Sequence, residues 1–87
     1  DGQAALAALT PFKTGIRLIR ALAVSPDGRT LIVGGSPGQV EVYDLPSREK
    51  RIAYDFDLGP VQSLAFAPDG LTLAVGAEKG LIVVDVE

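Results

Sequence analysis

The sequence of 87 residues contains no cysteine, no histidine, no methionine and no tryptophan. Without cysteine it forms no disulfide and performs no thiolate chemistry. Without histidine and cysteine it also lacks the usual ligands of zinc and transition metals. Serine hydroxyls are present, but no histidine is available as the ordinary base that activates one. We therefore predict a protein that is not an enzyme and holds no metal and no cofactor.

Positive charge is also scarce. Eight Lys and Arg residues stand against 11 Asp and Glu, which gives a formal net charge of −3 and a pI near 4.7. Binding to phosphate backbones depends largely on clustered Lys and Arg, so we do not expect nucleic acid as a partner.

Long apolar runs are missing as well. No stretch approaches the roughly 20 apolar residues of a membrane span, and the sequence does not start with a charged and then apolar signal segment. We expect a soluble protein with no membrane partner and take the cytoplasm as its default compartment. Because Met is absent even at position 1, we also expect the chain to have been processed or cut from a longer one.

An internal repeat is present instead. The segment LAVSPDGRTL at residues 22–31 returns 42 residues later as LAFAPDGLTL at residues 64–73. A fixed period of this size is typical of repeat proteins. The composition is that of a folded chain, with 47% hydrophobic and 22% charged residues. Ten Gly and six Pro separate short apolar runs, which indicates strands and tight turns. The predicted class is all-β.

Alternation and turn residues divide both units in the same way. Pro, Asp and Gly form the first turn by a known mechanism: Pro presets φ, Asp bonds its own backbone and Gly accepts positive φ. The turn residues are Pro26, Asp27, Gly28, Pro68, Asp69 and Gly70, and Gly38 and Gly80 mark the next hairpin. The expected strands are 19–24, 30–34 and 39–44 in the first unit and 61–66, 72–76 and 81–85 in the second.

A fourth strand is expected at residues 50–56, with Ile52, Tyr54 and Phe56 on one side and Arg51, Ala53 and Asp55 on the other. The equivalent strand before the first unit would be residues 3–10, although the composition of residues 4–9 favours a helix. Asp44 and Asp85 lie 41 residues apart, so the second unit has lost one residue in its third strand or the preceding turn.

These features resemble the WD-repeat β-propellers. Tyr43-Asp44 stands where that family has Trp-Asp, and Val84-Asp85 is a weaker version of the pair. The Gly-His pair and the Trp of the usual repeat are missing, and other propellers, including bacterial surface and quinoprotein-like ones, contain a similar turn. The resemblance implies two four-stranded antiparallel blades in one propeller segment over residues 1–87, with repeat one at about 1–44 and repeat two at about 45–87.

Two blades do not close a ring, because propellers typically have about 4 to 8. About 400 Å² of bare apolar face on each side forfeits on the order of 10 kcal/mol at roughly 25 cal/mol per Å². We therefore expect the segment to be completed by missing blades of a longer chain or by self-assembly. Three copies would give six blades and four would give eight, joined head to tail.

Candidate sites each have a simpler structural interpretation. The 34–38 stretch (GGSPG) lacks the ending of a phosphate loop, so a hairpin is favoured. Asp55 and Asp57 could bind a cation or act as an acid/base pair, but solvated edge carboxylates are favoured. The hydroxyl candidates are Ser25, Ser36, Ser47 and Ser63.

Basic and aromatic side chains supply the remaining candidates. Arg48, Lys50 and Arg51 form the densest basic cluster and could dock an acidic partner, as could Arg17 with Arg20, although a solvated face is favoured. The two tyrosines, Tyr43 and Tyr54, could anchor an interface, although packing between blades is favoured.

These observations predict a non-catalytic scaffold that binds protein partners, a function that comes from fold analogy. The first alternative is an engineered or ancestral-type self-assembling repeat fragment with only a structural role. The second is a non-catalytic part of a larger propeller enzyme. Flanking sequence would separate the scaffold from the enzyme part.

Overall fold

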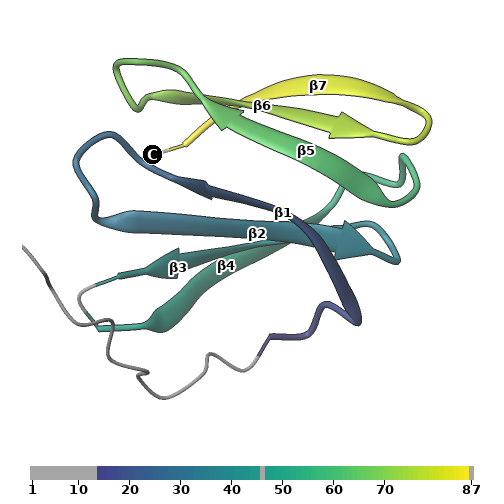
Figure 1. Cartoon of the computed structure of the whole chain (residues 1–87), viewed down its shortest axis with the longest axis horizontal. Helices are drawn as coiled ribbons and strands as arrows, with labels where there is room; N and C mark the ends of the chain where they lie inside the picture. Colours follow the sequence, from purple (N-terminus) through teal and green to yellow (C-terminus); the bar gives the residue numbers. More distant parts are fainter. Residues whose placement is uncertain (1–13, 46, 87) are drawn as a thin grey trace, which may run out of the picture.

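The computed structural model describes residues 14–45 and 47–86, which form seven strands in two antiparallel sheets (Figure 1). The first sheet has the order β1-β2-β3-β4 and the second the order β5-β6-β7. The bounds are β1 Leu18–Val24, β2 Thr30–Ser36, β3 Gln39–Asp44, β4 Glu49–Asp55, β5 Val61–Phe66, β6 Thr72–Ala77 and β7 Gly80–Asp85. No helix occurs in these two ranges, and the predicted all-β class is confirmed.

The prediction of four strands in each blade holds only for the first sheet, because the second has three strands within the described residues. The strand expected at residues 3–10 lies outside the described part of the chain. By its place in the repeat, the strand β4 belongs to the second unit of the sequence but pairs with the first sheet, next to β3. The first sheet is therefore built across the boundary between the two sequence repeats.

The first turn of each unit folds as its residues dictate. The Gly28 N–H donates to the Ser25 carbonyl at 2.9 Å, and the Gly70 N–H donates to the Ala67 carbonyl at 2.9 Å. Gly28 has φ +76° and Gly70 has φ +74°, a region that side chains with a Cβ rarely adopt. The Asp27 carboxylate accepts the Arg29 N–H at 2.9 Å and so closes the turn.

The second hairpin differs from the prediction. Gly38 lies in the loop with φ +152°, whereas Gly80 is the first residue of β7 and pairs with Ala77. Strands β2 and β6 stay 42 residues apart up to Gly35 and Ala77, and beyond the loop the offset is 41. The lost residue therefore lies in the β6–β7 hairpin, and Gly80 has no turn role.

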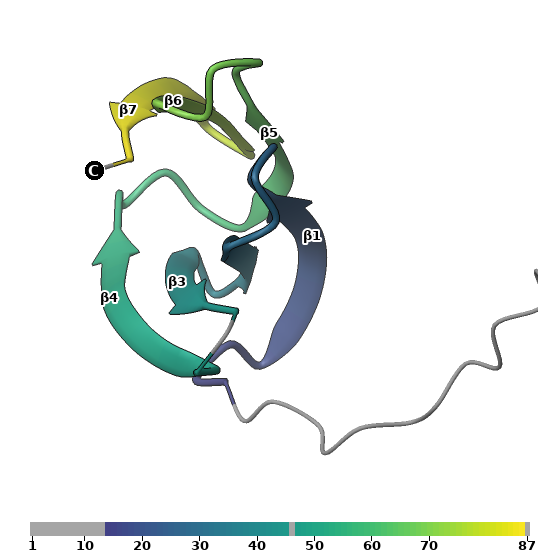
Figure 2. The same ribbon diagram turned by 90° about the vertical axis from the view of Figure 1, so that its left-hand side faces the viewer.

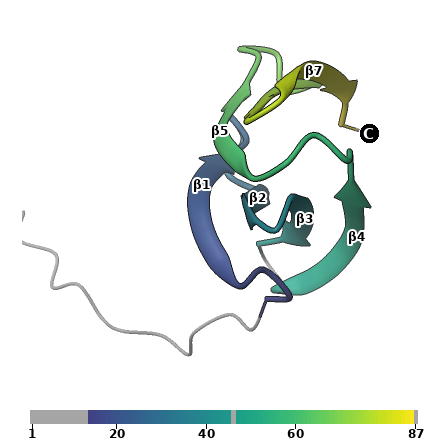
Figure 3. The ribbon, with the colours of Figure 1, turned by 90° about the vertical axis from the view of Figure 1, so that its right-hand side faces the viewer.

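The two sheets pack face to face. Ile32, Val40 and Val42 of the first sheet meet residues of the second in one buried cluster. Its members from the second sheet are Val61, Leu73 and Val75. Seen end-on from either side, the smaller sheet covers the larger, with β5 beside β1 and the end of β7 on the same side as β4 (Figures 2 and 3).

Candidate functional site

Each sheet has one face covered by the other sheet and one outer face, which we call open; on the open face of the first sheet only β1 is exposed, because Val33 and Tyr43 of β2 and β3 are 2% and 3% exposed. On the open face of the first sheet, Ile19, Leu22 and Val24 are 48%, 61% and 52% exposed. On the open face of the second sheet, Leu81 and Val83 are 72% and 64% exposed. We call these two surfaces the β1 face and the β7 face.

Strand register shows which side each residue occupies. Leu22 is paired with Val33, which packs in a small cluster behind the first sheet, away from the second. Val83 is paired with Ala74, whereas its neighbours Ile82 and Val84 pack into the core between the sheets. Directly paired residues point to the same side, so the exposed side chains belong to the open faces.

The two open faces are the repeat equivalents of the two buried ones. By strand register, Leu81 and Val83 correspond to Val40 and Val42, which are only 1% and 6% exposed. In the same way, Leu22 corresponds to Leu64, which packs against the core. Side chains that the molecule buries at its internal interface are therefore exposed at its two ends.

A buried carboxylate lies beside the β1 face, on the same side of the first sheet. The Glu41 side chain is 2% exposed and accepts the Tyr43 hydroxyl at 2.6 Å and the Gly15 N–H at 3.0 Å. The Lys50 ammonium lies 3.6 Å from the same carboxylate. Burial, followed by the hydrogen bond to Glu41, raises the pKa of Tyr43 to about 12. Ile16 is buried beside Tyr43, so this cluster joins residues 14–16 to the sheet.

Sequence reasoning missed Glu41. It sits on a strand between apolar residues, which alone indicates an ordinary outward-facing position. The available signal was the repeat itself, because the register equivalent of Glu41 is Ile82, a partly buried apolar residue that packs against the core. A charged residue at a position that is apolar in the other unit indicates a buried polar group with partners.

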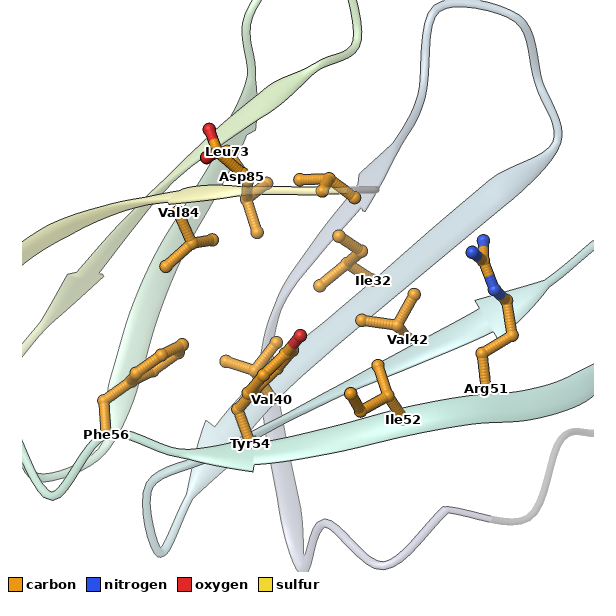
Figure 4. Close-up of a pocket in the computed structure, with 11 residues that line it drawn as sticks. Ile32, Val40, Val42, Arg51, Ile52, Tyr54, Phe56, Leu73, Val84 and Asp85 are labelled. Atoms are coloured by element: carbon orange, nitrogen blue, oxygen red, sulfur yellow. The ribbon is translucent and has the colours of Figure 1, made fainter.

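A groove runs between β4 and the second sheet (Figure 4). Ile52 and Tyr54 are 44% and 40% exposed along it, and the Tyr54 ring stacks on Phe56 with 5.6 Å between centroids. Arg51 also lines the groove, although alternation placed it on the opposite side from Ile52. A register shift in the β3–β4 pairing leaves Arg51 as an extra residue and re-aims its side chain.

The predicted basic cluster does not form one surface. Lys50 contacts Glu41 behind the first sheet, whereas Arg51 lines the groove on the other side. Arg48 lies in the turn before β4, where its N–H donates to the Asp44 carbonyl at 2.6 Å. The Arg17 and Arg20 side chains are exposed at the start of β1.

The two tyrosines are also separated: Tyr43 is buried behind the first sheet and Tyr54 lies in the groove. Of the signature pairs, Asp44 and Asp85 end β3 and β7, and Val84 packs in the core next to β6. The Asp44 carboxylate accepts the Ser47 hydroxyl at 2.8 Å. The signature residues thus lie at strand ends, in the core or in a hydrogen bond within a turn.

No described side chains assemble into a reaction centre. Asp57 lies outside β4, and its N–H donates to the Asp55 carboxylate at 3.0 Å, so the two aspartates do not share one strand. The Ser25 hydroxyl donates to Asp27 at 2.5 Å, and this bond, the largest cause, lowers the pKa of Asp27. The other serines are Ser36 at the end of β2, Ser47 beside Asp44 and the exposed Ser63.

The 34–38 stretch covers the end of β2 and its hairpin, as favoured for this stretch. Nowhere in residues 14–45 and 47–86 do three His, Cys, Asp or Glu side chains gather in a metal-binding group. The same residues contain no helix long and apolar enough to cross a membrane.

Residues 10–44 match the family described as "WD domain, G-beta repeat". The match covers the first unit of the repeat, which is less than half of the chain. The structure is similar to the crystal structure of the Cps50 (Swd1) β-propeller domain from Myceliophteria thermophila, with a TM-score of 0.73 and 21% identity over 80% of this chain. The resemblance to WD propellers is thereby confirmed. This chain spans 23% of that domain's length, and none of the curated proteins matches it.

Proposed function

We propose that this chain is a non-catalytic propeller scaffold whose two blades assemble with further copies into a closed ring. WD propellers generally serve as protein-interaction scaffolds, and this supports the coarse function. The observation that carries the finer proposal is the pair of open apolar faces, with Leu81 at 72% and Leu22 at 61% exposure. A folded monomer rarely leaves contiguous apolar faces in water.

Ring closure also gives a partner to the free edge of β7, which pairs only with β6 in the described part of the chain. A fourth strand at that edge would cover Ile52 and Tyr54 in the groove (Figure 4). We propose that a neighbouring copy supplies this strand, so that no blade is left incomplete.

Light scattering of the purified 87-residue chain, with circular dichroism to verify sheet content, tests the proposal. The expected mass is three or four times 9.0 kDa, which corresponds to six or eight blades. A mass of one chain with full sheet content would overturn it. If the ring forms, acidic or other protein partners are to be sought on its outer surface, because assembly covers the open faces.

A further inference from the structure

The chain contains two Asp-Gly pairs, Asp27-Gly28 and Asp69-Gly70, at the same position of the two Pro-Asp-Gly turns. We infer that Asp69-Gly70 is a site of spontaneous covalent modification, at which the aspartate converts to isoaspartate. The fold of the first turn protects Asp27-Gly28 from the same reaction. This inference concerns each copy of the chain and does not depend on the proposed assembly.

An Asp-Gly pair is suited to this isomerisation because glycine has no Cβ to hinder its own main-chain nitrogen. The Gly70 nitrogen loses its proton and forms a bond to Cγ of Asp69 in the neutral, protonated form of that side chain. The bond from Cγ to the hydroxyl oxygen breaks, and this oxygen leaves as water with the hydroxyl proton and the proton lost by the nitrogen. The product is a five-membered succinimide ring.

One water molecule then opens the succinimide, so the overall reaction neither gains nor loses atoms. Addition of water at Cγ breaks the new bond and restores aspartate. Addition at the main-chain carbonyl carbon of Asp69 breaks the original peptide bond instead. The chain is then linked through Cγ, and residue 69 has become isoaspartate.

The main chain of the two turns gives the two pairs the same starting geometry. Gly28 and Gly70 have φ +76° and +74°, and each N–H donates at 2.9 Å to the carbonyl three residues earlier. Asp27 and Asp69 are both exposed and line one cavity of about 300 Å³, so water reaches both. A difference in their reactivity must therefore come from the side chains around the two carboxylates.

A serine holds the carboxylate of the first turn. The Ser25 hydroxyl donates to the Asp27 carboxylate, and the Ser25 oxygen accepts the Thr30 N–H at 3.0 Å. The same carboxylate accepts the Arg29 N–H at 2.9 Å. These bonds, with the one from Ser25 as the largest cause, lower the pKa of Asp27 and reduce the share of the neutral acid that the reaction consumes. They also restrain the rotation by which Cγ approaches the Gly28 nitrogen.

The second turn lacks this serine. Ala67 stands where the first turn has Ser25, and Leu71 stands where it has Arg29. The Asp69 carboxylate accepts the Leu71 N–H at 2.9 Å, and alanine has no hydroxyl to add a second hydrogen bond. A hydrogen bond to a charged group changes an equilibrium by about tenfold or more, so isoaspartate should form at Asp69 at least about ten times faster than at Asp27.

The modification falls where the two sheets meet. Both turns lie at the same end of the molecule (Figure 1), and a Cβ added to Gly70 would lie 3.3 Å from Cδ of Pro26. The turn between β5 and β6 therefore lies against the turn between β1 and β2. Isoaspartate adds one methylene group to the main chain, so the reaction lengthens the second turn at this contact.

Ageing of the 87-residue chain at mildly acidic pH tests the inference. The aged protein is unfolded and digested with endoproteinase Asp-N, which cleaves before aspartate but not before isoaspartate, and mass spectrometry quantifies the peptides. Isoaspartate is expected at residue 69, with at least about tenfold less at residue 27. Ageing in guanidinium chloride is the control, because unfolding removes the hydrogen bonds of Ser25 and the two pairs should then react at similar rates.

Reciprocal substitutions are the matched variants, because each exchanges the residue that distinguishes the two turns. Ser25→Ala should raise the rate at Asp27 toward the rate at Asp69. Ala67→Ser should lower the rate at Asp69 toward the rate at Asp27. Circular dichroism verifies that both variants are folded, and the comparison of the two pairs in the wild type needs neither of them.

Equal rates at Asp27 and Asp69 in the folded wild type would overturn the inference. The absence of isoaspartate from the folded chain, when both pairs react in guanidinium chloride, would also overturn it. An unchanged rate at Asp27 in folded Ser25→Ala would show that the serine does not protect the first turn. The reaction occurs within single chains, so a wild type that proves monomeric would remove the proposed ring and leave this inference standing.

Discussion

Replacing Glu41 tests the buried polar cluster behind the first sheet. Glu41→Ile installs the residue that the second unit has at this position, and it removes the 2.6 Å hydrogen bond from the Tyr43 hydroxyl, on a side chain only 3% exposed. Removing the acceptor of a buried hydrogen bond costs about 1–3 kcal/mol. Tyr43→Phe removes the donor instead and costs about 1.5–3 kcal/mol, because the lost hydrogen bond is to a charged group.

The double variant Glu41→Ile/Tyr43→Phe removes the donor and the acceptor of this hydrogen bond together. Its cost should therefore be smaller than the sum of the single costs by at least about 1.5 kcal/mol. Lys50→Met is the control, and it should cost less than Glu41→Ile because the Lys50 side chain is 48% exposed and the substitution leaves both hydrogen bonds to Glu41 in place.

Urea unfolding followed by circular dichroism measures these free energies. All variants must be compared at one protein concentration, because the proposed assembly would add concentration-dependent stability. Single costs that add to the double cost within about 0.5 kcal/mol would refute the account of Glu41 and Tyr43 as one coupled unit.

Three further predictions concern the core, pH and the turns. Val33→Asp should abolish the folded circular dichroism spectrum, because Val33 is 2% exposed and a buried, unpaired carboxylate is costly. Val83→Asp, at a 64% exposed site, should leave the spectrum intact. A folded Val33→Asp variant would contradict the strand assignment. The pKa of the Tyr43 hydroxyl is 10.0 in the unfolded chain and about 12 in the folded chain. As the pH rises from 10 to 12, the free energy of unfolding should therefore decrease by about 1.4 kcal/mol per pH unit. Tyr43→Phe should lack this part of the decrease when urea unfolding is measured at each pH. Gly28→Ala should cost about 1–2 kcal/mol at φ +76°, and Gly80→Ala should change thermal stability little, since an added Cβ meets its nearest atom at 3.8 Å; equal losses would contradict the different roles of the two glycines.

The strands could be predicted because two independent signals agreed at each of them. Alternation set the faces of 39–44 and 61–66, and the Pro-Asp-Gly turns set where neighbouring strands begin, so these two bounds match the structure. Two copies of the unit made each assignment testable against the other. The open faces also followed from the blade count, although the residues that form them emerge only from the strand register.

The differences arise where one residue is gained or lost. A bulge turns Arg51 into the groove, and a shorter hairpin makes Gly80 a strand residue, and neither event changes the local composition. Glu41 was missed for another reason. Its partners Gly15 and Lys50 are far away in sequence or on another strand, so only the folded chain brings them to the carboxylate.

The central claim is that each open face packs against a blade of another copy of the chain. Native mass spectrometry of the 87-residue chain counts the copies directly. The account predicts complexes of three or four chains of 9.0 kDa each. These complexes should remain assembled on dilution until the protein concentration reaches their dissociation constant. A single species of one chain that retains a sheet spectrum and cooperative unfolding would contradict it.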